Sequence, residues 1–459
     1  MTYNIGEKPL VCLHPRMGTR AMRLMPVLTA TFLLNACVEE PILPGERFGT
    51  RASLAEIEAG TAAEDVTIDG PRAISLPTAE RVTVWAQRSL NTRNRLPHLA
   101  LAAEPTAIWV ADIGAGNNRR QRITADPVAA DGRVFTIDAA SSLYATSLEN
   151  GAAIWQFDLT PDFDRGGGIS GGGLAVVSGT VYATTGYGEV VALDAATGDV
   201  RWRQRLGAAL GAPTVNDGIL YVMANDSQAW SLDTQDGRIR WQIPAAEARA
   251  VLSGGAAPAV TDQFVILPFA TGEIQAVFPE SGVRFWGTFV AGGRLGAAYA
   301  AINDITADPV SVGNTIYVGN QSGRVVAFDA RSGARQWQAT DGAYSPVLAA
   351  GDSLFFVSDR NELIRIESAT GTRIWGAELP FHVRERERRR KAVFAHYGPL
   401  LAGGHLVVAS GDGFIRMFTP DSGDLLASIE LRGGAASHPI VVNDTLLVVS
   451  RDGRLHAYR

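Results

Sequence analysis

Side chains that carry out catalysis or hold metals are sparse and widely spaced in this chain. The histidines of its C-terminal half never stand at the short spacing of a zinc site, and both cysteines precede residue 38; these residues are His382, His396, His405, His438 and His456, with Cys12 and Cys37. Two glycine-rich stretches, residues 165–173 and 291–296, lack the Gly-Lys-Ser/Thr ending of a phosphate-binding loop. We expect their glycines to allow close backbone approach or to form a connector. The sequence therefore predicts no catalytic residue, metal site or cofactor.

Cys37 is the residue with the most specific predicted chemistry, which is acylation of its thiol. Residues 22–37 place Arg23 before an apolar run that ends in small residues, as in a secretion signal. The run is too short to span a bilayer, which takes roughly 20 apolar residues in a helix. Its end, Leu-Asn-Ala-Cys at residues 34–37, resembles a bacterial lipobox. We predict a signal peptide over residues 1–36 and a lipid anchor on Cys37. The alternative is a chance cysteine in a short buried segment.

The segments on either side of this signal have different characters. Residues 1–21 fit no normal signal, and either an upstream start codon assigned in error or a long n-region accounts for them. Val38 follows the cysteine in place of an aspartate, which, by resemblance to sorting in enteric bacteria, favours the periplasmic face of the outer membrane. Residues 37–96 form a predicted tether, because Pro and Gly recur and apolar periodicity is weak. Trp85 and the apolar residues near His98 predict that its end packs on the following domain.

A hairpin pattern recurs through the rest of the chain and must supply its architecture. Residues 189–202 (EVVALDAATGDVRW) combine an apolar run rich in β-branched residues, a turn with Asp and Gly, and a segment in which apolar and charged residues alternate. This alternation predicts a half-buried strand. A Gly stands four residues before a Trp in six places, with tryptophans at Trp155, Trp202, Trp241, Trp286, Trp337 and Trp375. A seventh turn, at Gly423, has Ala427 in place of the Trp. The tryptophans are the predicted structural anchors of the repeat.

The spacing of these turns predicts a closed ring of blades. A period in the mid-forties matches the four-stranded antiparallel blade of a β-propeller. Trp109 falls on the same lattice without a blade before it, while the C-terminal segment 438–459 reads as three strands without a fourth. We therefore predict an all-β, eight-bladed propeller over residues 97–459, in which an N-terminal strand around Trp109 completes the C-terminal blade. Closure of this kind removes open sheet edges.

Composition and charge narrow the classes of partner. The chain has 459 residues, 46% of them hydrophobic, which is enough to form a large core. Its formal net charge of -6 argues against general affinity for nucleic acid, where a basic face is expected.

Residues 384–391 depart from the repeat. They carry Arg384, Arg386, Arg388, Arg389, Arg390 and Lys391 against only Glu385 and Glu387. Two interpretations stay open. Charge runs usually form solvated surface loops; alternatively, this insertion contacts anionic lipid headgroups or an acidic partner.

The hairpin motif LDAATGxxxW, repeated to eight blades behind a lipobox, resembles the PQQ-like propellers of the BamB family, lipoproteins of the outer-membrane β-barrel assembly machinery. The resemblance covers the chain from about Met22 to Arg459. It implies a non-enzymatic scaffold, itself a monomer, that binds the POTRA domains of BamA and joins other subunits of the Bam complex. It also implies a lipid-anchored location at the outer membrane. The repeat alone is less specific, because quinoprotein dehydrogenases share it.

The family's contact segments can be aligned to two places in this sequence. In AVLSGGAAP, Leu252 matches a family leucine, and Ser253 replaces the family arginine. In NDITADPV, Asp304 matches the first family aspartate, and Thr306 replaces the second. The resemblance thus implies partner-binding roles for Leu252 and Asp304, although Leu252 is equally compatible with an ordinary blade position. Arg249 and Arg294 are candidates to replace the missing arginine.

Two other functions are compatible with such a ring. One is a PQQ-dependent dehydrogenase, whose relatives are usually longer and often carry a Cys pair and a Ca²⁺ site. The other is an extracytoplasmic ligand-binding or sensor propeller. The lipobox, the tether and a single propeller without a recognisable cofactor site favour the scaffold function.

Overall fold

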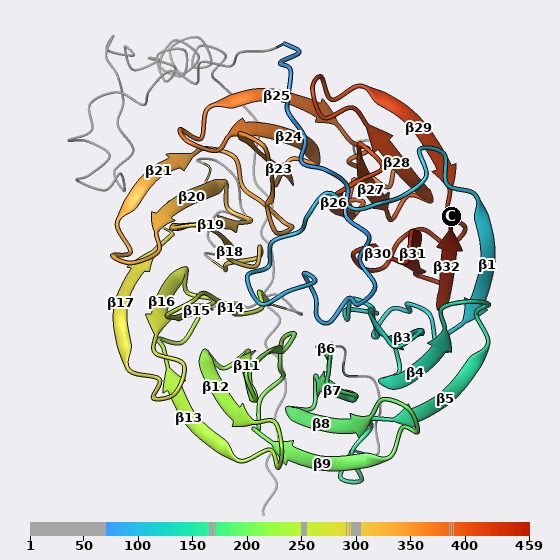
Figure 1. Ribbon diagram of the computed structural model, residues 1–459, viewed down its shortest axis with the longest axis vertical. Coiled ribbons are helices and arrows are strands. Elements are labelled where there is room, and N and C mark those ends of the chain that lie inside the picture. The colour runs from blue at the N-terminus through green and yellow to red at the C-terminus, as the bar shows by residue number, and fades with distance from the viewer. Residues whose placement is uncertain are drawn as a thin grey trace, which may run out of the picture. The chain divides into compact units, whose positions relative to one another are not determined.

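The protein is an eight-bladed β-propeller (Figure 1). The computed structural model describes residues 70–459 except 165–168, 170, 249–254, 291, 293, 295–303, 385, 387 and 389. Each blade is a four-stranded antiparallel sheet, and within the first seven blades the strands run in chain order from the channel to the rim. The predicted fold class is confirmed. Among the described residues, no helix has the length and apolarity needed to cross a membrane.

The strands of the first four blades are as follows. Blade 1 has β2 (Val128–Ala130), β3 (Arg133–Ile137), β4 (Ser142–Ser147) and β5 (Ala153–Asp158). Blade 2 has β6 (Gly172–Val177), β7 (Thr180–Thr185), β8 (Glu189–Asp194) and β9 (Val200–Arg205). Blade 3 has β10 (Thr214–Asn216), β11 (Ile219–Ala224), β12 (Gln228–Asp233) and β13 (Ile239–Pro244). Blade 4 has β14 (Ala259–Val260), β15 (Val265–Pro268), β16 (Glu273–Val277) and β17 (Arg284–Phe289).

The strands of the last four blades complete the ring. Blade 5 has β18 (Val310–Val312), β19 (Thr315–Asn320), β20 (Arg324–Asp329) and β21 (Arg335–Ala339). Blade 6 has β22 (Leu348–Ala350), β23 (Ser353–Val357), β24 (Glu362–Glu367) and β25 (Arg373–Glu378). Blade 7 has β26 (His396–Ala402), β27 (His405–Ser410), β28 (Phe414–Phe418) and β29 (Leu425–Glu430). Blade 8 has β30 (Ile440–Val442), β31 (Thr445–Ser450), β32 (Arg454–Tyr458) and, from the other end of the domain, β1 (Ala107–Asp112).

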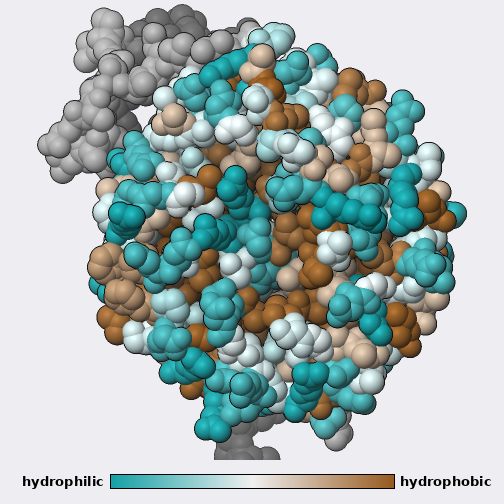
Figure 2. Space-filling model, in the orientation of Figure 1, coloured by the Kyte–Doolittle hydropathy of each residue, from teal (hydrophilic) through white to brown (hydrophobic). Residues whose placement is uncertain are grey.

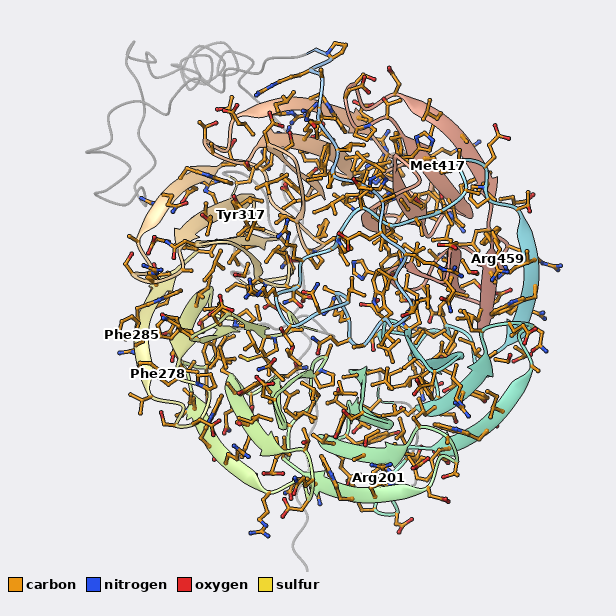
Figure 3. All side chains as sticks on the ribbon, in the orientation of Figure 1. Arg201, Phe278, Phe285, Tyr317, Met417 and Arg459 are labelled. Atoms are coloured by element: carbon orange, nitrogen blue, oxygen red, sulfur yellow. The ribbon has the colours of Figure 1, made fainter. Side chains whose placement is uncertain are left out.

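The ring closes where β1 pairs with β32, as the sequence predicts. The two strands are antiparallel, and Trp109 lies opposite Ala457. Beyond them, the backbone N–H groups of Thr106 and Arg459 each donate to the other residue's carbonyl, at 2.8 Å in both directions. The guanidinium of Arg459, labelled in Figure 3, also donates to Thr445 Oγ1 on strand β31. Both ends of the domain are therefore fixed in one sheet.

Each tryptophan of the repeat packs across a junction between blades. The ring of Trp155 in blade 1 lies on Gly198, in the outer hairpin of blade 2, and its Nε1–H donates to the Ala195 carbonyl in that hairpin at 3.2 Å. The same contact recurs for Trp202, Trp241, Trp286, Trp337 and Trp375, whose indole nitrogens donate over 2.8–3.3 Å. A Cβ on any of the facing glycines would lie within 3 Å of an indole ring, which explains why glycine stands at these turns.

The missing tryptophan at Ala427 has a structural reason. A Trp in the outer strand of blade 7 would pack on the outer hairpin of blade 8. Blade 8 has no such hairpin, because its outer strand β1 is not joined to β32 by a turn. At the next junction, Trp109 on β1 does lie on a hairpin glycine, Gly151 of blade 1. The one gap in the tryptophan series therefore coincides with the seam of the ring.

A strap formed by residues 72–104 crosses one face of the ring (blue in Figure 1) and binds every blade. Trp85 and Leu99 are almost fully buried, at 1% and 0% exposure, so the prediction that this region packs on the propeller is confirmed. His98 accepts a hydrogen bond from the Gly404 N–H, which leaves its other ring nitrogen to donate to the Pro77 carbonyl at 2.7 Å. From blade 1 to blade 8, the strap's partners are Ala129, Val176, Val215, Val260, Ser311, Arg365, Leu401 and Asn443.

The strap makes the two faces of the ring different. Asn443, in the innermost turn of blade 8, donates to the Val82 carbonyl at 2.8 Å, so the innermost turns lie on the strap face. The antiparallel order then places the connections between blades on the opposite face, which we call the connection face. On the strap face, Figure 2 shows apolar residues around the centre and mostly polar residues along the lower margin.

The tryptophan contact predicts that two glycines of similar backbone conformation differ in their tolerance of alanine. Gly333 has φ +69° and its Cβ would lie 2.6 Å from the Trp286 ring, whereas Gly132 has φ +73° and no atom within 4 Å. We expect Gly132→Ala to lower the free energy of unfolding by about 1 kcal/mol, because alanine disfavours a positive φ. Gly333→Ala should lower it by about 1–3 kcal/mol more, because the new methyl group would displace the Trp286 ring. Urea denaturation of both variants measures the difference, and equal losses would contradict the proposed contact.

Candidate interaction face and channel

A cavity of about 480 Å³ occupies the channel between the inner strands. Its walls come from the connections before β2, β14, β18, β22, β26 and β30 and from turns on the connection face. Arg88 of the strap contributes from the other end. The lining includes Tyr344, Asn361 and Tyr397 beside apolar residues. A volume of this size is within the range of small-ligand sites.

Arg88 crosslinks the strap to the inner ring through buried charges. Its Nε donates to Asp126 at 2.9 Å, its Nη1 lies 3.4 Å from Asp308, and the same nitrogen donates to the Gly255 carbonyl at 2.8 Å. Asp308 also accepts from Ser89 Oγ of the strap at 3.1 Å. Both carboxylates are almost inaccessible to water, so each needs a positively charged partner inside the protein. Arg88 serves as that partner for Asp126, which precedes blade 1, and for Asp308, which precedes blade 5.

Asp126 remains ionised because its partners outweigh its burial. Burial is the largest single influence and disfavours the carboxylate, but the attraction and hydrogen bonds of His438 and Arg88 lower the pKa of Asp126 to about 2. His438 donates to Asp126 from its backbone N–H at 2.8 Å, and its Nδ1 lies 3.1 Å from the same oxygen. The cluster thus joins the strap, blade 1 and the start of blade 8.

The cavity wall contains polar atoms that find no partner among the described residues. These atoms are Gln321 Nε2, Ser437 Oγ and His438 Nε2. Water satisfies such groups in most channels. Within the described part of the chain, no group of three His, Cys, Asp or Glu residues has the arrangement of a metal site. The cavity can therefore hold water or a polar group, and the arrangement of its side chains indicates no particular reaction.

Of the two predicted partner-binding residues, Asp304 lies within the described part of the chain and Leu252 does not. Asp304 lines the cavity and is only 3% exposed, and nearby Thr306 donates to the Ala343 carbonyl at 2.8 Å. Leu252, Ser253, Arg249 and the acylation site Cys37 lie outside the described residues. Arg294, considered above as a replacement for the family arginine, binds both carboxylate oxygens of Asp359 at 3.0 and 3.1 Å. Its guanidinium is thus already engaged within the ring.

The two glycines that begin β6 allow close approach of strand β7 and of the connection before β10. A Cβ on Gly172 would lie 1.9 Å from the Thr184 carbonyl oxygen, and one on Gly173 would lie 2.6 Å from Ala212. The expected close backbone approach is confirmed for these two residues. Residues 168–172 also match the letters of a GxSxG nucleophile motif. That motif needs a strand before the serine and a helix after it, whereas here the strand β6 follows.

Sequence reasoning missed the role of Arg88. The only available signal was the alternation of Val82, Val84 and Ala86 around Trp85, which is typical of a strand and unexpected in a flexible tether. No local pattern indicates that Arg88 meets Asp308, which is 220 residues further along the chain.

The lowered pKa of Asp126 predicts how stability depends on pH. A carboxylate with a folded-state pKa of about 2, against about 3.9 when unfolded, stabilises the fold above pH 4. That contribution, about 2 kcal/mol, is lost as the pH falls through 2. We therefore expect the stability difference between wild type and Asp126→Asn to shrink by about 2 kcal/mol between about pH 5 and about pH 2 in urea denaturation.

The matched control is Asp262→Asn, which removes the exposed partner of Arg93, another strap arginine. Exposed pairs contribute less than about 1 kcal/mol, so this variant should behave like wild type over the same pH range. A pH-independent difference for Asp126→Asn would contradict the assigned ion pairs.

Known proteins resemble this chain over most of its length. The curated assembly factor BamB of Yersinia pestis is 26% identical over 379 residues, covering 81% of this chain and 93% of the relative. BamB of Escherichia coli K12 is 23% identical over 368 residues, covering 79% and 91%.

Solved structures share the fold at lower identity. BamB from Moraxella catarrhalis superposes with a TM-score of 0.65 at 18% identity, covering 78% of this chain and all of that one. A quinohemoprotein alcohol dehydrogenase from Comamonas testosteroni gives a TM-score of 0.60 at 14% identity, covering 83% and 81%. A family model described as "Outer membrane protein assembly factor BamB" matches residues 139–377. Because this match spans more than half of the chain, the protein belongs to the BamB family.

Proposed function

We propose that the protein is a non-enzymatic scaffold subunit of the outer-membrane protein assembly complex. In this role it binds the POTRA domains of BamA and assists the insertion of β-barrel proteins. Membership of the BamB family is the observation that carries the proposal. The solved quinohemoprotein dehydrogenase shares the fold at 14% identity, which supports no transfer of its activity to this chain.

The rigidity of the ring suits this role. The strap binds all eight blades, and seven tryptophans pack on hairpin glycines of the neighbouring blades. A surface that is already ordered loses little conformational entropy on binding, so a modest interface gives useful affinity. Loops on such a frame vary freely without disturbing it.

The connection face is the surface that we assign to the partner. The strap covers the centre of the opposite face, whereas the segments that contain Leu252 and Asp304 belong to the connections of blades 3 to 4 and 4 to 5. Asp304 is buried in the channel, so it acts by holding its connection in place or by meeting a side chain that enters the cavity. Leu252 is the proposed direct contact.

Lipid attachment at Cys37 would place this surface beside its partner. In this proposal residues 1–36 are removed as a signal peptide, and the last part of the predicted tether of residues 37–96, from residue 72 onward, lies in the strap. Confinement to the membrane that holds the barrel subunit raises the effective concentration of the two proteins. The ring itself is taken to act as a monomer at the periplasmic face of the outer membrane.

Site-specific crosslinking tests the assigned face. A photo-crosslinking residue at position 252 or at Tyr344, which is 37% exposed at the cavity, should capture the barrel subunit in intact cells. The same residue at Ser332, in an exposed hairpin on the strap face, is the matched control and should not. Capture from position 332 alone would contradict the assignment of the face. Capture of the barrel subunit from none of the positions would contradict the partner.

The anchor is tested at the thiol. We expect mass spectrometry of the mature protein to find an acylated N-terminal Cys37. Cys37→Ser should move the protein from the membrane fraction to the soluble periplasmic fraction, because the remaining chain has no acyl group. Cys12→Ser is the control and should leave both results unchanged. An unmodified N-terminus upstream of residue 37 would contradict the anchor.

A further inference from the structure

A short hairpin projects from the connection between blades 6 and 7. Its two arms pair within residues 381–394, where Val383 N–H donates to the Ala392 carbonyl at 3.0 Å and Phe394 N–H to Phe381 at 2.9 Å. Between the arms stand the exposed side chains of Arg384, Arg386, Arg388 and Lys391. No other connection among the described residues carries a comparable run of basic side chains. The hairpin thus forms a positively charged projection on the connection face.

A second pair of exposed arginines lies further along the same face. Arg119 and Arg120 belong to the connection between β1 and β2. A series of backbone hydrogen bonds joins this connection to the base of the hairpin, through the loops of blades 7 and 8: Gly411 to Ala395, Ala435 to Ser410, Arg451 to Gly434, and Asn117 to Arg451, over 2.6–2.9 Å. We call these six residues, Arg119, Arg120, Arg384, Arg386, Arg388 and Lys391, the basic arc.

The charge of the basic arc is not neutralised by the described residues around it. None of its six side chains lies in an ion pair or hydrogen bond with another described residue; Glu385 and Glu387 lie outside the described residues. On the outer strands, by contrast, Arg201 and Arg240 bind Asp194 and Asp233 at 2.8 and 2.9 Å. A chain with a net charge of -6 therefore concentrates positive charge on one part of one face.

Apolar side chains stand beside these charges. Phe381, Val383 and Val393, all on the hairpin arms, are 38%, 45% and 54% exposed. Basic residues interspersed with exposed apolar ones are typical of surfaces that lie at the headgroup level of a bilayer. Five of the six residues are arginines, whose planar guanidinium matches the oxygens of a phosphate better than an ammonium group does.

We propose that the basic arc docks on the surface of a bilayer that contains anionic phospholipids. The arginines bind headgroup phosphates while Phe381, Val383 and Val393 enter the interface. The combination of arginines with exposed Phe381, Val383 and Val393 on one short hairpin favours a bilayer surface over an acidic protein surface. The inference rests on the proposed function only for the location of the protein at a membrane. A lipid anchor holds a protein more firmly at a membrane when a polybasic surface also binds the headgroups. This second contact would also determine which face of the ring lies toward the lipid.

Vesicle sedimentation tests this proposal without any partner protein. Residues 63–459 form one compact unit that contains every described strand and its pairing partner, so this fragment, which lacks the acyl site, is suitable. We expect it to bind phosphatidylcholine vesicles that contain phosphatidylglycerol and not vesicles of phosphatidylcholine alone. Binding should weaken about fivefold for each basic residue removed, and it should fall as salt is raised. The test variant is Arg384→Ser/Arg386→Ser/Arg388→Ser/Lys391→Ser.

The matched control removes the same charge from elsewhere. Arg95→Ser/Arg238→Ser/Arg331→Ser/Arg335→Ser changes four exposed arginines outside the basic arc and should bind like wild type. Equal binding by the two quadruple variants, or no binding of wild type to the anionic vesicles, would overturn the proposal. The test variant can also be examined in the crosslinking experiment described above. If it no longer captures the barrel subunit but still binds anionic vesicles, the basic arc contacts an acidic protein surface and the proposal is wrong. The vesicle experiment contains no partner protein, so its result does not depend on whether the proposed scaffold function is correct. The two proposals can therefore fail separately.

An orthogonal measurement uses the acylated full chain. Reconstituted in the anionic vesicles, it should resist trypsin cleavage between residues 384 and 391, and the neutral vesicles should give no protection. Cleavage at equal rates in both would contradict docking by the hairpin even if the fragment sediments.

Discussion

The contact between an indole ring and a glycine of the next blade is the constraint on which the rest of the ring depends. For the six tryptophans from Trp155 to Trp375, it combines apolar packing, a hydrogen bond from the indole N–H and a glycine with positive φ. Trp109 packs on its glycine in the same way, but its indole N–H has no partner among the described residues. Each blade is thus positioned by the one before it. The contact needs two partners from successive repeats. For this reason the series ends at Ala427, where the next blade has no hairpin to receive a tryptophan, and resumes at Trp109 on the other side of the seam.

The strap adds a second, independent set of contacts. Tryptophan contacts act only between neighbouring blades near the rim, whereas residues 72–104 cross the face and contact blades that are far apart in the ring. Arg88 is the clearest case, because it binds carboxylates from blades 1 and 5 near the channel. The two sets together explain how a ring closed by a single strand pair presents loops with a fixed geometry.

The sequence contained the information for the ring but not for its channel. The tryptophan and glycine spacing is periodic, so the number of blades, their order and the closure through Trp109 could all be predicted. The environment of Asp304 could not, because its burial depends on connections from several blades meeting in the channel. The same applies to Arg88: a local pattern shows that its segment can be extended, but not which carboxylates lie 38 and 220 residues away. Leu252 and Cys37 lie outside the described residues, and their assignments stay predictions.

The course of the strap also determines how mechanical load would enter the domain. A pull on the chain before residue 72 reaches the hydrogen bonds of the strap first, from Arg72 beside blade 7 to Leu99 on the same blade, and only afterwards β1. The strand that closes the ring is therefore shielded from tension by the segment that precedes it, and the propeller resists being unzipped from its own N-terminus.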